Sequence, residues 1–165
     1  MDLLNGLQIF LEGLAHDPVA YSVVLFVYTV AATVFLPFPV EVALLGSGQT
    51  PVAVVALVLG AGKAVGSVIV FYLGDKVGGG LEKWIGTSKV FKGLETFVEK
   101  TRYFGMYILL SIPGMLDTVP LYLFALFNRR GVMHLRQFAL VNFLAGITRA
   151  SIVLALFHLF NIRLV

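Results

Sequence analysis

The first half of the chain contains two long apolar runs. Val19–Val40 carries no charged residue over 22 positions, and this length is sufficient to cross a bilayer. The segment Pro37-Phe38-Pro39 interrupts the run just before Glu41. The second run, Pro51–Gly74, has 24 residues with Lys63 as its single charge, and it predicts a membrane-spanning helix. Whether Val19–Leu36 spans the bilayer or turns back within it is left open by the pattern.

The second half repeats this order of features. Tyr103–Asn128 is apolar over 26 residues apart from Asp117, and Pro113-Gly114 breaks it. Phe138–Phe160 follows as a predicted spanning segment with Arg149 near its middle. Each half therefore has a proline-broken run, followed by an apolar segment that carries one basic residue.

Two further segments alternate apolar and polar residues with helical spacing. In residues 3–14, leucines and a phenylalanine recur every three or four positions, which predicts a short helix in the membrane interface. Residues 75–102 are the main polar stretch and begin with the glycine run 78–80. From Val90 onward this stretch predicts a second amphipathic helix lying on the membrane surface.

Composition places these segments in a membrane. The chain is 59% hydrophobic and only 13% charged, against about 25% charged residues in soluble domains. The apolar runs are continuous, so their pattern does not match the alternation of a β-barrel. We therefore expect a single all-α integral membrane domain over 1–165, with halves at about 19–74 and 103–160 joined by the linker 75–102.

The distribution of basic residues predicts the orientation. Segment 75–102 holds six Lys or Arg residues and is expected in the cytoplasm. The next basic residues are Arg129, Arg130 and Arg136. They lie on the cytoplasmic side as well only if Tyr103–Asn128 enters the membrane and returns to the side from which it came. Its arms of about 10 and 13 residues would be roughly 15–20 Å long as helices, too short to cross. We therefore predict a multi-pass protein of the cell membrane with loops 75–102 and 129–137 cytoplasmic.

By the same logic, Pro37 and Pro39 predict a re-entrant hairpin that enters from the opposite side. The expected fold is an inverted-repeat helical bundle with two opposed re-entrant hairpins and surface amphipathic helices. Irregular backbone at membrane depth is tolerated where it is buried in protein or lines a cavity. Both breaks should therefore meet near the midplane.

Four ionisable residues in the apolar runs are the candidate site: Glu41, Lys63, Asp117 and Arg149. A charge at the bilayer centre costs about 2.5–3.5 kcal/mol on insertion scales, so such residues are usually paired and functional. Broken hydrophobic segments at matching places in two halves also indicate a transporter's binding site. The alternative is that the four residues form two structural ion pairs that lock the hairpins together.

Small residues accompany the two bases. Gly62 and Gly66 flank Lys63 in a small-xxx-small pattern, and Gly146 precedes Arg149 by three positions. Such glycines allow close helix approach, so packing is their expected role.

These motifs resemble the DedA/VTT superfamily of small membrane proteins. The matching segments are FLPFPVE (35–41), GKAVGS (62–67) and FYLGD (71–75) in the first half. In the second half, PGMLD (113–117) and GITR (146–149) resemble the short YqaA-type branch. Leu110 and Leu116 stand where many bacterial members have arginines, and Ser67 stands where many have an acid.

The resemblance implies a helical bundle with two opposed re-entrant hairpins. It also implies translocation of polyprenyl phosphates or scrambling of phospholipids, proton-dependent in bacterial members. The expected partner is therefore a membrane lipid with an anionic or phosphate headgroup. Lys63 and Arg149 would attract the phosphate, and Glu41 and Asp117 would compete for these bases.

Other functions find less support. His16, His134 and His158 are scattered without metal-ligand spacing, so neither an enzyme nor a metal or other cofactor is expected. The basic loops indicate membrane orientation before a nucleic-acid partner. A small-solute or ion exporter, working as a homodimer, and a membrane scaffold that tethers a partner through 75–102 remain open alternatives.

Overall fold

All regular structure in the described residues is helical, which confirms the all-α part of the predicted fold. The computed structural model describes residues 17–35, 40–44, 47, 50–85, 89–126 and 133–160. Its helices are α2 (Pro18–Val34), α3 (Glu41–Leu44), α4 (Val52–Ile85), α5 (Lys89–Ser111), α6 (Thr118–Leu126) and α7 (Leu135–Leu159). The predicted helix at 3–14, together with Pro37 and Pro39, lies outside the described residues.

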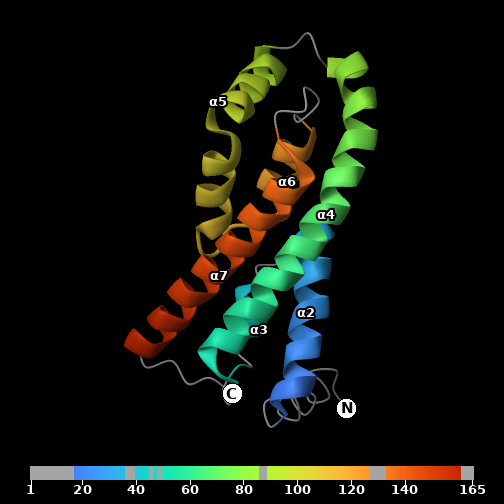
Figure 1. Cartoon of the computed structure of the whole chain (residues 1–165). Helices are drawn as coiled ribbons and strands as arrows, with labels where there is room; N and C mark the ends of the chain where they lie inside the picture. Colours follow the sequence, from blue (N-terminus) through green and yellow to red (C-terminus); the bar gives the residue numbers. More distant parts are fainter. Residues whose placement is uncertain are drawn as a thin grey trace, which may run out of the picture.

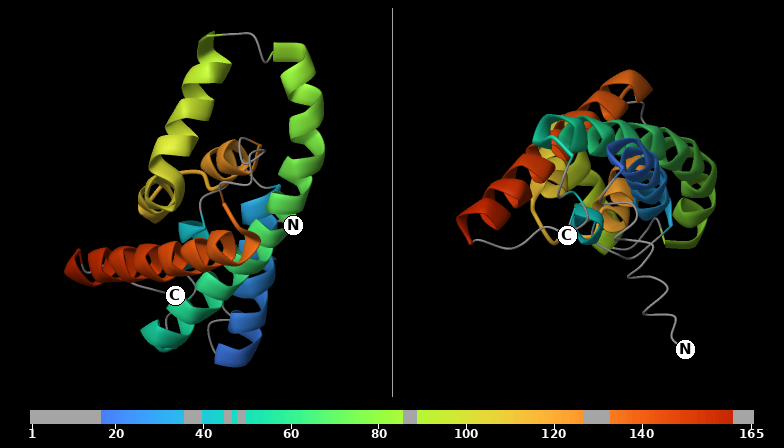
Figure 2. Two further views of the ribbon diagram at one scale, coloured as in Figure 1. Left: turned by 45° about the horizontal axis from the view of Figure 1, so that its top comes forward. Right: turned by 90° about the horizontal axis from the view of Figure 1, so that it is seen from below.

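Helices α4 and α7 form the centre of the bundle (Figure 1). They run in opposite directions and pack extensively on each other, and α2 and α6 also pack on α4. Helices α2 and α4 both begin at the end of the bundle where α7 finishes (Figure 1). Helix α5 begins at the opposite end, where α4 finishes, and returns toward the middle (Figures 1 and 2).

The ends of two helices follow directly from their sequence. Asp17 caps α2, because its Oδ1 accepts hydrogen bonds from the backbone N–H groups of Val19 at 2.9 Å and Ala20 at 3.2 Å. Helix α5 ends at Ser111, two residues before Pro113, whose ring disfavours helical backbone in the preceding residue. Gly114 then adopts a φ of 77°, which glycine reaches without a steric penalty.

The apolar core is divided into two clusters. One is built around Tyr21, Leu25 and Leu59 and continues onto the last part of α7. The other is built around Val70, Phe124 and Phe138 and joins α4, α5, α6 and the first part of α7. On α4 and on α7, the buried base of each helix lies in sequence between residues of the two clusters.

The polar segment 75–102 differs from the prediction in its first part. Helix α4 does not end at Gly74 but continues through the glycine run to Ile85. Each glycine costs about 1 kcal/mol relative to alanine, which is too little to end a helix that no proline interrupts. The amphipathic stretch is the first part of α5, and non-helical backbone at Arg102 (φ 45°, ψ −131°) separates it from the second part, which ends at Ser111. The first part of segment 75–102 is therefore the end of α4, whereas its amphipathic part is a helix from Lys89 to the break at Arg102, in agreement with the helix predicted from Val90 onward (Figure 2).

Two of the described helical stretches are long and apolar enough to cross a membrane. They are Val52–Gly74 within α4 and Leu135–Leu159, which is α7. Helix α2 is apolar but shorter, with 17 residues.

Candidate functional site

The structure brings Glu41, Lys63, Asp117 and Arg149 into one continuous network of ion pairs. Lys63 Nζ lies 3.0 Å from Asp117 Oδ1, and Arg149 Nη1 lies 2.7 Å from the same oxygen. Arg149 also binds Glu41 through two parallel hydrogen bonds, Nε to Oε1 at 2.6 Å and Nη2 to Oε2 at 2.8 Å. The order of contacts is therefore Lys63, Asp117, Arg149, Glu41, with alternating charge. We call these four residues the charge cluster.

The position of each member follows from the helix that carries it. Each acid stands where a helix begins after a break: Glu41 is the first residue of α3, and Asp117 immediately precedes α6. Each base projects from within a long helix, Lys63 from α4 and Arg149 from α7. The cluster thus lies where the two broken segments meet the two longest apolar helices.

Backbone groups of the second break complete the cluster. Lys63 Nζ donates to the carbonyl of Leu110 at 3.1 Å, and Arg149 Nη2 donates to the carbonyl of Met115 at 2.7 Å. Carbonyls near a helix C-terminus lack intrahelical partners and attract cations, so Lys63 stabilises the end of α5. The second break also provides a donor to one of the acids, because the backbone N–H of Gly114 donates to Glu41 Oε1 at 2.7 Å.

The cluster is closed except on the side of Glu41. The side chains of Lys63 and Arg149 are 0% exposed and that of Asp117 is 3% exposed, whereas that of Glu41 is 15% exposed. Burying charges is costly unless they are paired and hydrogen-bonded. The two acids and two bases meet this condition, because each is hydrogen-bonded to a residue of opposite charge and their formal charges sum to zero.

One carboxylate oxygen of the cluster makes no hydrogen bond to any described residue. Asp117 Oδ1 accepts from both bases, while Oδ2 is buried and makes no hydrogen bond within the described part of the chain. The buried hydroxyl of Ser111, at the end of α5, is unpaired in the same sense. Buried polar atoms usually have partners, so an unpaired carboxylate oxygen is an atom to which a buried water molecule could donate a hydrogen bond.

The predicted glycines lie at close helix contacts. A Cβ on Gly62 would fall 2.8 Å from Thr29 Cβ, and a Cβ on Gly66 would fall 2.7 Å from Thr33 Cβ, both on α2. A Cβ on Gly146 would lie 2.8 Å from the Cα of Gly60 and 3.1 Å from the Lys63 side chain. These glycines set the distances between α2, α4 and α7, and so the place where Lys63 and Arg149 meet the acids.

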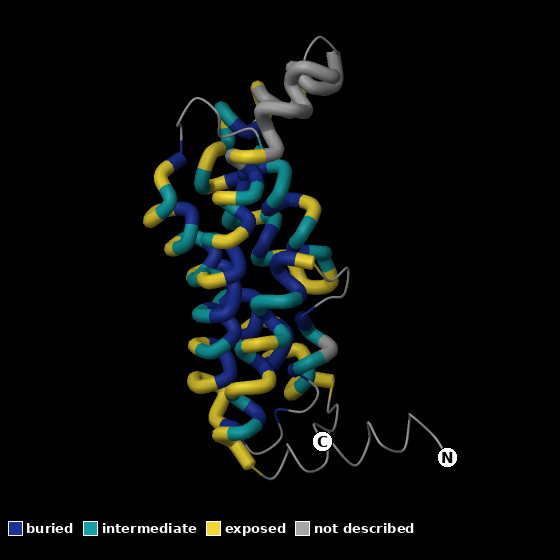
Figure 3. The backbone as a smooth tube through the Cα atoms, turned by 90° about the vertical axis from the view of Figure 1, so that its right-hand side faces the viewer, coloured by how far each residue is buried: buried dark blue, intermediate teal, exposed yellow. Residues whose placement is uncertain are grey.

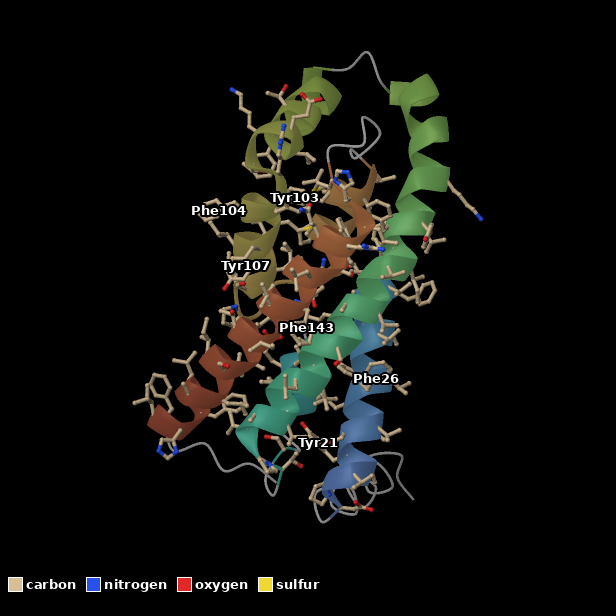
Figure 4. The ribbon with its side chains drawn as sticks, in the orientation of Figure 1. Tyr21, Phe26, Tyr103, Phe104, Tyr107 and Phe143 are labelled. Carbon is tan, nitrogen blue, oxygen red and sulfur yellow. The ribbon has the colours of Figure 1, made fainter. Side chains whose placement is uncertain are left out.

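Tyrosines of α5 connect this helix to α7, and sequence reasoning did not identify their contacts. The hydroxyl oxygens of Tyr107 and Thr148 lie 2.8 Å apart, and the Tyr103 hydroxyl accepts from the backbone N–H of His134 at 2.7 Å. Phe104, on the same helix, points away from the bundle and is 72% exposed (Figure 4). The role of Gly114 as a hydrogen-bond donor is likewise not visible in the sequence, because a residue pattern does not show where a backbone N–H will point.

No metal-binding arrangement is present among the described residues, since they include no group of three or more His, Asp or Glu side chains placed to hold an ion. Comparison of the chain with models of protein families, with curated proteins and with solved structures finds no match. The resemblance to the DedA/VTT superfamily therefore stays a prediction from the motifs. The class that the described residues define is an all-helical protein with a buried, charge-balanced ion-pair cluster.

Proposed function

We propose that the chain is an integral membrane protein that translocates lipids bearing a phosphate group, with the charge cluster as the point where the headgroup crosses.

The distribution of side chains supports a membrane location. Val19, Val23 and Val27 form an outward stripe on α2 and are 73%, 59% and 60% exposed. Leu57 on α4 and Leu140 on α7 are also more than half exposed, and exposed positions recur along the helices (Figure 3). Apolar faces outside and charges inside suit a protein surrounded by lipid.

Under this proposal, the two broken segments are re-entrant hairpins that enter from opposite sides. Helix α2 starts at one end of the bundle, and the chain is back at that end where α4 begins (Figure 1). The second part of α5 runs to the middle and α6 returns toward the end from which α5 came (Figure 1). The inverted arrangement predicted from Pro37 and from Pro113-Gly114 is compatible with this course of the chain.

The charge cluster supplies the chemistry for an anionic headgroup. A phosphate that enters from the lipid would exchange with a carboxylate for Lys63 or Arg149, while its acyl or prenyl tails stay in the hydrocarbon. Such an exchange conserves the number of ion pairs, so no base is left unpaired during passage. Protonation of one of the two acids would couple transport to a proton gradient.

One observation carries this proposal: two fully buried bases are held by carboxylates at the place where both broken segments meet. A purely structural ion pair could stand anywhere along two packed helices. Broken helices that present backbone groups and charges to one another are typical of substrate sites in transporters.

The test is translocation of a fluorescent anionic phospholipid in reconstituted vesicles. We expect Lys63→Gln and Arg149→Gln each to slow translocation by roughly tenfold to a hundredfold, because a hydrogen bond to a charged group contributes about 1.5–3 kcal/mol. Lys100→Gln, which removes an exposed lysine on α5, is the control and should leave the rate unchanged. Wild-type rates in both Lys63→Gln and Arg149→Gln would reject headgroup capture and leave the cluster as a structural lock.

Proton coupling has a separate readout in the same vesicles. We expect the wild-type rate to depend on pH and this dependence to change in Glu41→Gln, which has no carboxylate to protonate. A wild-type rate that does not respond to pH would remove the coupling while leaving passive scrambling intact.

A further inference from the structure

Glu41 accepts hydrogen bonds from a set of donors whose positions do not depend on Glu41. Its carboxylate accepts from Arg149 Nε at 2.6 Å, from Arg149 Nη2 at 2.8 Å and from the backbone N–H of Gly114 at 2.7 Å. These donors come from α7 and from the break after α5, at positions 73 and 108 residues along the chain from Glu41. Two guanidinium N–H groups and one backbone N–H converging on two oxygens are the donors that proteins use for oxyanions.

Arg149 would stay in place if Glu41 moved away. Its Nη1 remains bound to Asp117 Oδ1 at 2.7 Å, and its Nη2 donates to the carbonyl of Met115 at 2.7 Å. Gly114 is held in its turn by backbone conformation, with a φ of 77°. The donors are therefore preorganised, and Glu41 is the member whose departure disturbs the fewest other contacts.

The same side of the cluster is also its open side. Glu41 is the most exposed of the four side chains, and Gly114 is exposed. A Cβ built on Gly114 would meet no atom within 4 Å, so the space beside this residue is open. Asp117 has the opposite character, since it is 3% exposed and shared by both bases.

Charge balance limits what can replace Glu41. Without the Glu41 carboxylate the remaining three members carry a net charge of +1, so a single negative charge restores neutrality. A phosphodiester carries one negative charge on two non-bridging oxygens, the same number of oxygens that Glu41 presents to Arg149. A phosphate monoester carries about −1.5 to −2 at pH 7, so it would leave surplus negative charge in a buried site.

We propose that Arg149 and the N–H of Gly114 form a binding site for a singly charged oxyanion of the phosphodiester class, and that Glu41 fills this site as an internal substitute when it is empty. This inference rests on the proposed function and sharpens it, because it favours phosphodiester headgroups over polyprenyl monophosphates. Glu41 is then a displaceable anion, and Asp117 is the fixed partner of both bases.

The test measures anion binding to purified protein in detergent, by thermal unfolding and without any transport. Glu41→Ala removes the carboxylate from the site. Glu41→Gln removes the charge but keeps the side-chain bulk, and it serves as the second variant if Glu41→Ala folds poorly. At pH 8 we expect dimethyl phosphate to raise the unfolding temperature of both variants, by roughly 5–10 °C near 100 times its Kd. Monomethyl phosphate, a dianion at this pH, should bind at least about tenfold more weakly. The wild type should show less than a tenth of the variants' affinity for dimethyl phosphate.

Controls separate this site from nonspecific effects of anions. Adding Arg149→Gln to Glu41→Ala should abolish the shift, whereas adding Lys100→Gln should leave it unchanged. Phosphatidylglycerol distinguishes the source of the anion, with a neutral diacylglycerol as the control for binding through the acyl chains. If phosphatidylglycerol binds more tightly than dimethyl phosphate, the site takes a lipid headgroup. If it binds equally or more weakly, the site takes a free diester.

Three outcomes would overturn the inference. They are absence of a shift in both Glu41 variants, an equal shift in the wild type, and equal or tighter binding of the dianion. These results are independent of translocation. If the protein translocates lipid in an Arg149-dependent manner but fails this test, the proposed function stands and the role of Glu41 as an internal substitute for the anion is rejected. A protein that binds dimethyl phosphate but translocates nothing loses only the proposed function.

Discussion

At the residue scale, Asp117 is the central member of the charge cluster. Both bases contact its Oδ1, and no other described residue joins α4 and α7 in this way. Among the described residues, Arg149 has Glu41 and the Met115 carbonyl as further partners, whereas Lys63 has only the Leu110 carbonyl in addition. The stability of Lys63 in its buried site therefore depends mainly on Asp117.

This dependence predicts coupling between Lys63 and Asp117. Lys63→Met and Asp117→Asn should each lower the free energy of unfolding by about 3–5 kcal/mol, because each leaves an unbalanced buried charge. The double variant should lose at least about 1 kcal/mol less than the sum, since its remaining charges balance again. Denaturant unfolding in detergent measures all three values. As a control, Lys100→Met combined with Asp117→Asn should be additive, and additivity in the Lys63 pair would mean that the two residues are energetically independent.

At the element scale, glycines on α4 determine how closely the helices approach. Gly66 lies against Thr33 of α2, and Gly60 lies against α7 beside Gly146. This spacing allows Lys63, which lies between these glycines on α4, to reach Asp117 at 3.0 Å. Larger residues would move the helices apart and lengthen the contacts of the charge cluster.

Gly66→Ala should therefore destabilise the protein by about 1–3 kcal/mol, the usual cost of overpacking. The new Cβ would lie 2.7 Å from Thr33 Cβ, an atom next to the backbone that cannot swing aside. Gly93→Ala in α5 is the matched control, because a Cβ there meets no atom within 4 Å. Alanine is a better helix former than glycine by about 1 kcal/mol, so this control should be as stable as the wild type or more stable. Thermal unfolding compares the two, and equal stability of both variants would argue against close packing at Gly66.

At the scale of the whole molecule, the course of the chain assigns positions to the two ends of the bundle. Asp17, before α2, and Leu159, at the end of α7, lie at one end (Figure 1). The starts of α5 and α7 lie toward the other end (Figure 1), and the contact of the His134 N–H with the Tyr103 hydroxyl keeps the start of α7 close to α5.

Cysteine labelling tests this assignment in a membrane, and the chain contains no cysteine that would interfere. We expect single cysteines at Lys100 and His134 to react with a membrane-impermeant maleimide from the cytoplasmic side. Cysteines at Asp17 and Leu159 should react from the opposite side. If positions 100 and 134 were labelled from different sides, the segment between them would cross the membrane, and the hairpin around Pro113 would be wrong.

The sequence by itself determined the features that depend on short stretches of chain. Continuous apolar runs predict helices, a proline ends or breaks the run that contains it, and a charge inside such a run requires a partner. The helical class and the identity of the four charged residues follow from these local rules. The extent of α4 did not: the apolar run predicts an end at Gly74, but the glycines at 78–80 only weaken a helix, and α4 continues to Ile85.

Only the tertiary structure decided which groups meet. Arg149 contacts Glu41 across 108 positions and Asp117 across 32, and no periodicity encodes such a choice. The crossing of α4 and α7, set by Gly60 and Gly146, brings both bases to one carboxylate oxygen. The N–H of Gly114 became a ligand of Glu41 only when the break after α5 was placed beside α3. Hydrogen bonds depend on distances of a few tenths of an ångström, and packing, not residue order, determines those distances.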